Sequence, residues 1–422
     1  MQLTKKKNRK QIKPHKYISI LDIGHSKVLC MIAKQSKEEG FKIIGMGHQA
    51  SRGFSGGQII HMNDAIQSIS NAITGAERQA NTTIETIVVN ISGQHMMSEI
   101  KKAGIKTNQK LITEHEIHRL FTEIQAIPED KNYELIHINP IDFSIDNLHH
   151  IQDPTGMTGQ KLTGYFYTIS IDKSALQNLV HALENCHVDL LDIHISQIAS
   201  AEACLSEDER QLGATLIDFG SQSIDIASYY QNQVIFMATI PLGGRHITHD
   251  LASVLSTSVN EAERLKNIVG SATVNKHDHL DMINVQKIND LGTLEMSIVP
   301  KSGITQIIQP RVEEFFEHIA QALTSLSRPD AKNRIVLTGG STNLSNMRDI
   351  ALRYLGGHIR LGKAQMLLGL PEHQMEASYS TAIGMLALMQ KKLKTNPMNI
   401  DPDQLAPKGF FKKISHWIKH HL

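Results

Sequence analysis

The sequence predicts an α/β protein with a duplicated fold in two lobes. Two similar segments carry this prediction. Residues 21–28 read Leu-Asp-Ile-Gly-His-Ser-Lys-Val, and residues 217–226 read Ile-Asp-Phe-Gly-Ser-Gln-Ser-Ile-Asp-Ile. Each apolar run leads into Asp-x-Gly and small polar residues before apolar residues return, which predicts a strand, a tight turn and a second strand. A third signal is the sequence Thr-Gly-Gly-Ser at 338–341, which follows an apolar strand.

Both turns have the chemistry of a phosphate site. Glycine lets the backbone approach an anion closely, and successive N–H groups in such a turn form an anion-binding nest. Asp22 and Asp218 would repel phosphate, so we expect them to hold the water ligands of Mg²⁺; the alternative is that each caps its own turn. Two such turns predict that the lobes clamp one polyphosphate. The residues expected to line it are Gly24, Ser26, Lys27, Gly220 and Ser223.

Two further features complete the predicted site. The pair Gly339-Gly340 leaves room for a flat group, such as a nucleoside, against bare backbone. Asp225 follows the second turn and either positions water or metal, or is an exposed strand charge. Each signal is weak alone, and their order and spacing make the combination specific.

These segments together resemble the actin/Hsp70/sugar-kinase superfamily and, within it, the FtsA family of bacterial cell-division proteins. The resemblance covers roughly residues 17–395 and the C-terminal tail. Other matching segments are 153–159, 196–205, 240–251, 260–266 and 378–386. The resemblance implies an actin-like (ribonuclease H-like, duplicated) ATP-binding fold with a small inserted α+β domain and a C-terminal amphipathic helix.

The resemblance also extends the set of candidate ATP-binding residues. Glu263 and Lys266 match a helix that contacts the nucleoside; the alternative is a surface ion pair. Gly243 and Gly244 follow the second phosphate loop. The remaining candidates are His25, Ser221, Gln222, Ser341 and Asn343.

Three positions depart from the family pattern. His25 stands where first loops usually carry Thr or Ser, and Gly-Ser-Gln-Ser at 220–223 stands where second loops usually carry three Gly and a Thr. Ser341 replaces the third glycine of the nucleoside loop. Bulkier residues at 221 and 222 restrict the backbone near the phosphates. We therefore expect ATP and Mg²⁺ to bind, with at most slow ATPase activity and no assigned catalytic residue.

The chain divides into several predicted parts, since 422 residues exceed one compact core. Predicted helices are 63–79 (with Asn63 as N-cap), 113–126 (with a capping box), 174–186, 196–206, 309–326 and 380–393. The predicted parts are a basic tail at 1–16; a first lobe at 17–91, 172–206 and 381–395; an inserted domain at 92–171; a second lobe at 207–250 and 311–380; its upper subdomain at 251–310; a linker at 396–408; and an amphipathic helix at 409–422.

Composition excludes some classes of function. A net charge of +1 argues against nucleic-acid binding dominated by phosphate contacts. The three cysteines are widely spaced in apolar segments and are expected to be reduced thiols of a cytosolic protein. The sequence contains no run of 18 apolar residues, so no transmembrane helix is predicted. The tail at 1–16 lacks the apolar core of a signal peptide and is expected to be solvated, with lipid contact as an alternative.

The C-terminal segment is predicted to be a short basic amphipathic helix that binds an anionic membrane surface. Its apolar residues recur every three or four positions: Phe410, Phe411, Ile414, Trp417 and Ile418. Lysines take the other face: Lys412, Lys413 and Lys419. One such helix binds reversibly, so firm attachment needs many copies in a polymer. The alternative is that the helix docks on the protein's own core.

The resemblance implies a tether that holds FtsZ polymers at the inner face of the cytoplasmic membrane at the division septum. The C-terminal tail of FtsZ would bind near residues 251–310 and the following helix. The inserted domain would engage later division proteins and neighbouring protomers of a filament. Two alternatives stay open: a pilus-assembly actin-like protein, which shares the inserted domain, and a phosphotransferase of the sugar-kinase branch.

Overall fold

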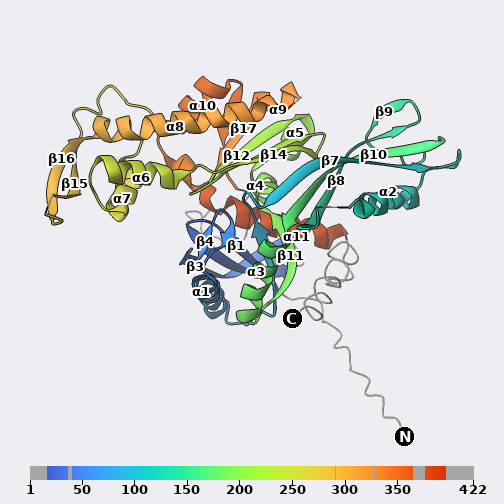
Figure 1. The fold of residues 1–422 in the computed structure, drawn as a ribbon, viewed down its shortest axis with the longest axis horizontal. Helices are drawn as coiled ribbons and strands as arrows, with labels where there is room; N and C mark the ends of the chain where they lie inside the picture. Colours follow the sequence, from blue (N-terminus) through green and yellow to red (C-terminus); the bar gives the residue numbers. More distant parts are fainter. Residues whose placement is uncertain are drawn as a thin grey trace, which may run out of the picture.

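The computed structural model describes residues 17–36, 40–128, 130–289, 291–326, 328–364 and 376–395 (Figure 1). Its first lobe is built on a five-stranded sheet in the order β11-β6-β1-β2-β3. The strands are β1 (Tyr17–Ile23), β2 (Lys27–Ser36), β3 (Gly40–Ala50), β6 (Thr86–Ile91) and β11 (Asp189–Ile195). β1 pairs antiparallel with β2 and parallel with β6.

The second lobe repeats this sheet with the same connectivity. Its order is β14-β13-β12-β17-β18, in which β12 pairs antiparallel with β13 and parallel with β17. The strands are β12 (Ala214–Phe219), β13 (Ile224–Tyr230), β14 (Gln233–Ile240), β17 (Arg334–Thr338) and β18 (His358–Leu361). The predicted duplication into two lobes is therefore confirmed.

Helices cover the sheets of both lobes. The first lobe has α1 (Met62–Ala80) and α3 (Lys173–Asn185), and α4 (Ser196–Cys204) packs on α11 (Ser380–Thr395). The N-cap of α1 is His61, so the prediction of Asn63 was wrong. Asn63 suited the cap by residue type, but the helix begins one residue earlier, with no capping side chain.

The inserted domain has its own four-stranded sheet, in the order β7-β10-β8-β9, and one helix. The elements are β7 (Met96–Lys106), α2 (Glu114–Ala126), β8 (Tyr133–Ile145), β9 (Leu148–Ile151) and β10 (Lys161–Asp172). The predicted capping box of α2 is confirmed, because Thr113 and Glu116 each bond the other's backbone N–H. A separate apolar cluster that includes Leu120 and Phe166 fills this domain.

A helical and β-hairpin unit extends from the second lobe. It contains α6 (Gly244–Val254), α7 (Val259–Val269), β15 (Met282–Ile288) and β16 (Leu294–Pro300). The long helix α8 runs over Lys301–Thr324, so the predicted start at 309 was wrong. Pro310 suits a first helical turn, but here it lies inside a helix whose earlier residues Ile304 and Ile308 are fully buried.

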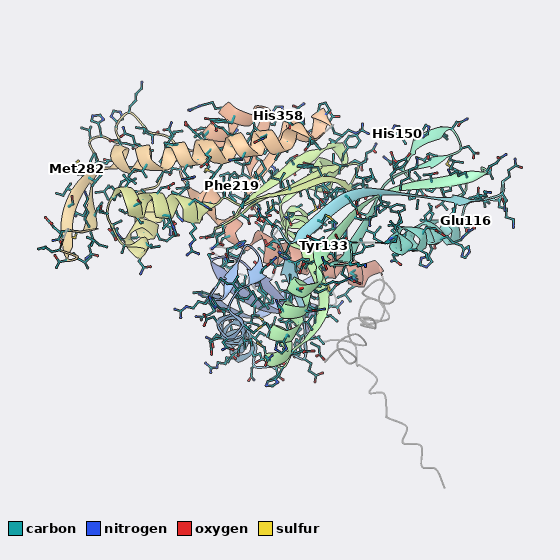
Figure 2. All side chains as sticks on the ribbon, in the orientation of Figure 1. Glu116, Tyr133, His150, Phe219, Met282 and His358 are labelled. Atoms are coloured by element: carbon teal, nitrogen blue, oxygen red, sulfur yellow. The ribbon has the colours of Figure 1, made fainter. Side chains whose placement is uncertain are left out.

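The inserted domain and the β15–β16 hairpin lie at opposite ends of the molecule, with the first lobe below the second (Figure 1). Figure 2 shows this separation through Glu116 at one end and Met282 at the other. Shorter elements are β4 (Phe54–Ser55), β5 (Gln58–Ile59), α5 (Glu207–Leu212), α9 (Pro329–Asn333), the 3-10 turns η1 (Gly340–Asn343) and η3 (Ala377–Tyr379), and α10 (Met347–Leu355).

The predictions for the tail at 1–16, the linker at 396–408 and the helix at 409–422 lie outside the described residues. Among the helices that are described, none has the length and apolar character needed to span a bilayer.

Candidate functional site

The two Asp-x-Gly turns have the same closure. Gly24 N–H donates to the carbonyl of Lys27 at 2.9 Å, and Gly220 N–H donates to the carbonyl of Ser223 at 2.9 Å. Both glycines approach that carbonyl closely, since an added Cβ would lie 3.1 Å from it at Gly24 and 2.9 Å at Gly220. The sequence similarity of the two turns therefore corresponds to a shared backbone geometry.

Both turns line one cavity of about 300 Å³ between the lobes. Strands β1, β2, β12 and β13 bring the turns there, and α7 and η1 close one side. Fourteen predicted residues line it: Asp22, Gly24, His25, Ser26, Lys27, Asp218, Gly220, Ser221, Ser223, Glu263, Lys266, Gly339, Gly340 and Ser341. Asp225 lines it as well. The predicted residues Gln222, Gly243, Gly244 and Asn343 are not among the lining residues.

Asp22, at the end of β1, is buried. Its Oδ1 accepts a hydrogen bond of 2.8 Å from Asn90 Nδ2, and Asn90 Nδ2 also reaches Ser196 Oγ at 3.0 Å. Burial raises the pKa of Asp22 to about 6, against the opposing effects of Lys27 and of the Asn90 hydrogen bond. The carboxyl is thus fixed in orientation but costly to ionise.

Asp218 occupies the equivalent position in the second lobe. Its Oδ2 accepts a 2.7 Å hydrogen bond from Ser200 Oγ, and burial raises its pKa to about 7, with Asp225 and Asp22 adding to the increase. Gly339 has a φ of +91°, and a Cβ there would lie 2.3 Å from Asp218 Oδ1. Glycine is therefore required at 339 for the close packing of this loop against Asp218.

Asp225 lies at the start of β13 and is fully engaged by neighbours. Its Oδ1 accepts hydrogen bonds from Gln197 Nε2 at 2.8 Å and Thr239 Oγ1 at 2.6 Å, and its Oδ2 accepts one from Ser223 Oγ at 3.1 Å. Burial raises the pKa of Asp225, and these three donors oppose the increase. The predicted alternative of an exposed strand charge is wrong, because the side chain is buried.

Three carboxyl groups line this cavity, but among the described residues no group of three His, Cys, Asp or Glu side chains could hold a metal ion directly, so a cation here would be held through water. Asp22, Asp218 and Asp225 line the same space, and the pKa of each is raised mainly by burial. Mg²⁺ prefers oxygen ligands and commonly retains waters. A cation facing these groups would offset the cost of their ionisation.

Lys27 supplies a positive charge from the first turn. Its Nζ lies 3.5 Å from the ring centroid of Tyr379 in η3, in a cation–π contact. Burial lowers the pKa of Lys27, and the nearby carboxylates of Asp22 and Glu376 oppose that effect. The ring therefore holds the ammonium at the cavity, in the first Asp-x-Gly turn.

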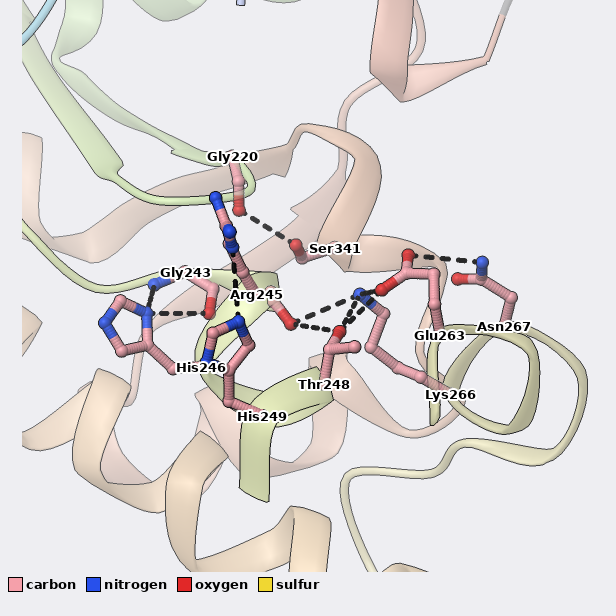
Figure 3. A network of polar contacts seen from close by, with 11 residues as sticks. Gly220, Gly243, Arg245, His246, Thr248, His249, Glu263, Lys266, Asn267 and Ser341 are labelled. Atoms are coloured by element: carbon pink, nitrogen blue, oxygen red, sulfur yellow. Dashed lines mark hydrogen bonds and ion pairs between the residues drawn. The ribbon is translucent and has the colours of Figure 1, made fainter. Parts of the chain in front are cut away.

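Glu263 and Lys266 form the opposite wall, with their side chains bonded to each other (Figure 3). Lys266 Nζ lies 2.7 Å from Glu263 Oε2 and also donates to Thr248 Oγ1 at 2.9 Å and to the carbonyl of Gly244 at 3.2 Å. Burial would raise the pKa of Glu263, but the hydrogen bonds from Lys266 and Thr248 outweigh it, so the pKa is lowered. Glu263 and Lys266 therefore form an ion pair and also line the cavity.

The glycine pair at 243–244 packs against the second Asp-x-Gly turn, outside the cavity lining. Gly244 N–H donates to the carbonyl of Gly220 at 3.1 Å, and Arg245 N–H donates to that of Ser221 at 2.8 Å. Ser341 Oγ donates to the carbonyl of Gly220 at 3.0 Å (Figure 3). An added Cβ at Gly243 would lie 2.7 Å from the backbone of Ser221. Gly243 and Gly244 were predicted to bind the ligand, but in the structure they support the turn that lines the cavity.

Sequence reasoning missed several polar residues of the cavity. Asn90 is the second-last residue of the apolar strand β6, and a polar residue near that strand's carboxyl end was the available signal. Thr381 of α11 also lines the cavity, and its hydroxyl lies 2.9 Å from that of Ser200 on α4, which is not itself among the lining residues. The other lining residues not predicted are Ile23, Ser92, Ser196, Asn267, Ala377 and Ser378.

Comparison with known proteins identifies relatives over nearly the whole chain. The family model "Cell division protein FtsA" matches residues 215–384, and the model "SHS2 domain inserted in FTSA" matches residues 93–170. The cell division protein FtsA of Rhizobium meliloti is 31% identical over 418 residues, covering 95% of this chain and 94% of the relative. The cell division protein FtsA of Neisseria meningitidis is 31% identical over 410 residues, covering 96% of this chain and 98% of the relative.

Solved structures share the fold at low sequence identity. The "PilM-PilN type IV pilus biogenesis complex" superposes with a TM-score of 0.63 and 14% identity, covering 89% of this chain and 99% of that one. MreB5 of Spiroplasma citri bound to ADP gives a TM-score of 0.57 and 12% identity, covering 91% and 99%. The fold is therefore the predicted actin-like one, with an inserted domain, and the chain belongs to the FtsA family of cell division proteins.

Proposed function

We propose that this protein binds ATP with Mg²⁺ in the cavity between its lobes. The observation that carries the proposal is the pair of turns, closed by the same 2.9 Å hydrogen bond, that line one cavity from opposite lobes. Glycine turns of this kind offer backbone N–H groups to anions.

The candidate residues divide by chemistry. Ser26, Lys27 and Ser223 would hold the phosphates, together with the backbone of the two turns. Asp22 and Asp218 would hold Mg²⁺ through water, and the ion would neutralise phosphate charge. Glu263 and Lys266 would contact the nucleoside, and Gly339-Gly340 would leave room for it. We expect at most slow ATP hydrolysis, since Asp225 already accepts three hydrogen bonds.

The same proposal extends to a cellular role as a tether in cell division. The protein would bind the C-terminal tail of FtsZ near residues 251–310 and along the rest of helix α8. It would engage other division proteins and neighbouring protomers of a filament through the inserted domain. Residues 409–422 would bind anionic lipid, which would place the protein on the cytoplasmic side of the inner membrane at the septum.

An exposed apolar strip supports the proposed partner surface. On β16, Leu294, Met296 and Ile298 are 60%, 65% and 62% exposed, and they alternate along the strand so that they share one face. On the paired strand, Met282 and Ile288 extend the same strip. Contiguous exposed apolar residues of this kind are typical of protein interaction sites.

No specific observation favours either alternative, the pilus-assembly protein or the sugar-kinase phosphotransferase. Likeness to the pilus protein is one of fold at 14% identity. For a sugar-kinase activity, the cavity would have to present a carboxylate base, and Asp225 is occupied by its three donors.

The test is recruitment of fluorescent FtsZ filaments to anionic liposomes by the purified full-length protein, with and without ATP–Mg²⁺. We expect recruitment with ATP, and its loss when residues 409–422 are removed. A triple variant with Leu294→Ser, Met296→Ser and Ile298→Ser should bind liposomes but fail to recruit FtsZ. If the native protein binds ATP and liposomes yet leaves FtsZ in solution, the tether function is wrong.

A further inference from the structure

His25 has an unusual position at the tip of the first phosphate turn. Its side chain lines the cavity, and its Nε2 is buried with no hydrogen-bond partner among the described residues. An unpaired buried polar atom is costly and calls for a partner. The cavity beside it is where the proposed polyphosphate would lie.

A second histidine stands close behind the first. His95 follows β6, and its Nδ1 is likewise buried with no partner in the part of the chain that the structure describes. Burial lowers the pKa of His25, and proximity to His95 lowers it further. Burial also lowers the pKa of His95, while a hydrogen bond with the backbone of Gly56 and the charge of Asp172 oppose this decrease. Both imidazoles are therefore held neutral in the ligand-free protein near pH 7.

The other charges around the cavity are mostly negative. Charged side chains come from the β1–β2 hairpin, the β12–β13 hairpin, α7 and the segment before η3. The acidic groups are Asp22, Asp218, Asp225, Glu263 and Glu376, and the basic groups are Lys27 and Lys266. Lys266 is paired with Glu263. Even with Mg²⁺ bound, a polyanion entering this space would be stabilised by further positive charge close to the first turn.

We propose that His25 is a proton-coupled phosphate contact: it takes up a proton from solvent when a polyphosphate binds, and its Nε2–H then donates to a phosphate oxygen. This inference rests on the proposed binding of ATP. Phosphate beside the imidazole favours its charged form, and the new hydrogen bond satisfies the unpaired nitrogen. Binding at this site then becomes stronger as pH falls, because proton and anion binding are linked.

The experiment measures proton uptake on ATP binding by titration calorimetry, in two buffers of different ionisation enthalpy, between pH 6 and pH 8. Saturating Mg²⁺ is present throughout. The proteins are the native chain, His25→Thr, His25→Asn and a control, His149→Thr, at an exposed position on β9. Titration of the phosphates and of the aspartates is common to all four, so a difference from the native chain isolates His25.

We expect the native chain and the control to take up as much as about one more proton per ATP than the two His25 variants. Over that pH range, the Kd of the native chain should rise by up to about tenfold per pH unit relative to His25→Thr. Unfolding temperatures of the ligand-free proteins check that the variants fold.

Two results separate failure of this inference from failure of the proposed function. If the folded His25 variants bind ATP with the native affinity and the native proton uptake, the role of His25 is wrong and ATP binding stands. If the native chain binds no ATP at any pH, the proposed function itself fails, and this inference fails with it.

Discussion

Replacing Gly340 tests whether the cavity holds a nucleotide. A Cβ added at this glycine would meet only Ser378 Cβ, at an ordinary contact distance of 3.6 Å, and Gly340 lines the cavity. Gly340→Ala should therefore fold and bind. Gly340→Leu should also fold, but its longer side chain would extend into the space that we assign to the nucleoside, so binding should be lost.

The expected magnitude follows from mass action. A ligand at 100 times its Kd stabilises the folded state by about 2.7 kcal/mol. That amount corresponds to an increase of several degrees in unfolding temperature for a domain of ordinary size. Gly340→Leu should keep the unfolding temperature of the ligand-free native protein but lose this increase.

The assay is thermal unfolding with and without ATP–Mg²⁺, supported by a direct binding titration. Gly339→Ala provides the contrast, because a Cβ at 339 would lie 2.3 Å from Asp218 Oδ1 and 2.5 Å from the carbonyl of Phe219. Gly339→Ala should therefore lower the unfolding temperature even when no ligand is present. The reasoning is refuted if ATP–Mg²⁺ leaves the native unfolding temperature unchanged, or if Gly340→Leu gains as much stability from ATP as the native protein.

Three further predictions concern pH, turnover and the tail. Asp218 has a pKa raised to about 7, so the folded state binds the extra proton between about pH 4 and pH 7 and ligand-free stability should fall as pH rises through that window. In urea titrations Asp218→Asn should flatten this decline; an unchanged slope would contradict it. Phosphate release should stay below about 1 s⁻¹, the low end of usual enzyme rates; faster steady-state release would favour a kinase. Removing 409–422 should abolish sedimentation with anionic vesicles and leave ATP binding intact, whereas native-like sedimentation would move the anchor to 5–16. Trp417, the chain's single tryptophan, should shift its emission to the blue on those vesicles, and high salt should weaken the effect.

Much of the fold was predictable because its signals are local. Each strand, Asp-x-Gly turn and returning strand are consecutive in the sequence, and both copies form antiparallel hairpins. The capping box at Thr113 and Glu116 likewise depends on residues three apart. Local chemistry of this kind needs no knowledge of distant parts of the chain.

The errors arose where packing overrides local preference. Pro310 is a plausible first-turn residue, and nothing nearby in the sequence shows that burial of Ile304 and Ile308 extends the helix to Lys301. The family resemblance placed Gly243 and Gly244 among the candidate ATP-binding residues. Their role as support for the second turn depends on contacts with Gly220, more than 20 residues away.

Long-range contacts also explain the missed site residues. Asn90 reaches Asp22 across 68 residues of sequence, and Gln197 reaches Asp225 across 28. Asn90 lies on strand β6 and Gln197 on helix α4, so these contacts can be recognised only once the fold has brought each amide beside its aspartate. A polar residue at the end of a buried strand is a signal for such a role, but it becomes specific only when a partner strand is known.

The connecting helices show why the cavity cannot be treated as two separate turns. α4 and α11 approach so closely that a Cβ at Gly384 would lie 1.7 Å from the carbonyl of Ala199. From this contact Ser200 reaches Asp218, and its hydroxyl lies 2.9 Å from that of Thr381. Asp218 is therefore bonded to α4, which is linked through Ser200 and Thr381 to α11. α11 ends at Thr395, and the predicted linker at 396–408 separates it from the segment to which we assign membrane binding. Because close packing transmits small displacements, a change at Asp218 has a short, continuous path through Ser200 and Thr381 to α11.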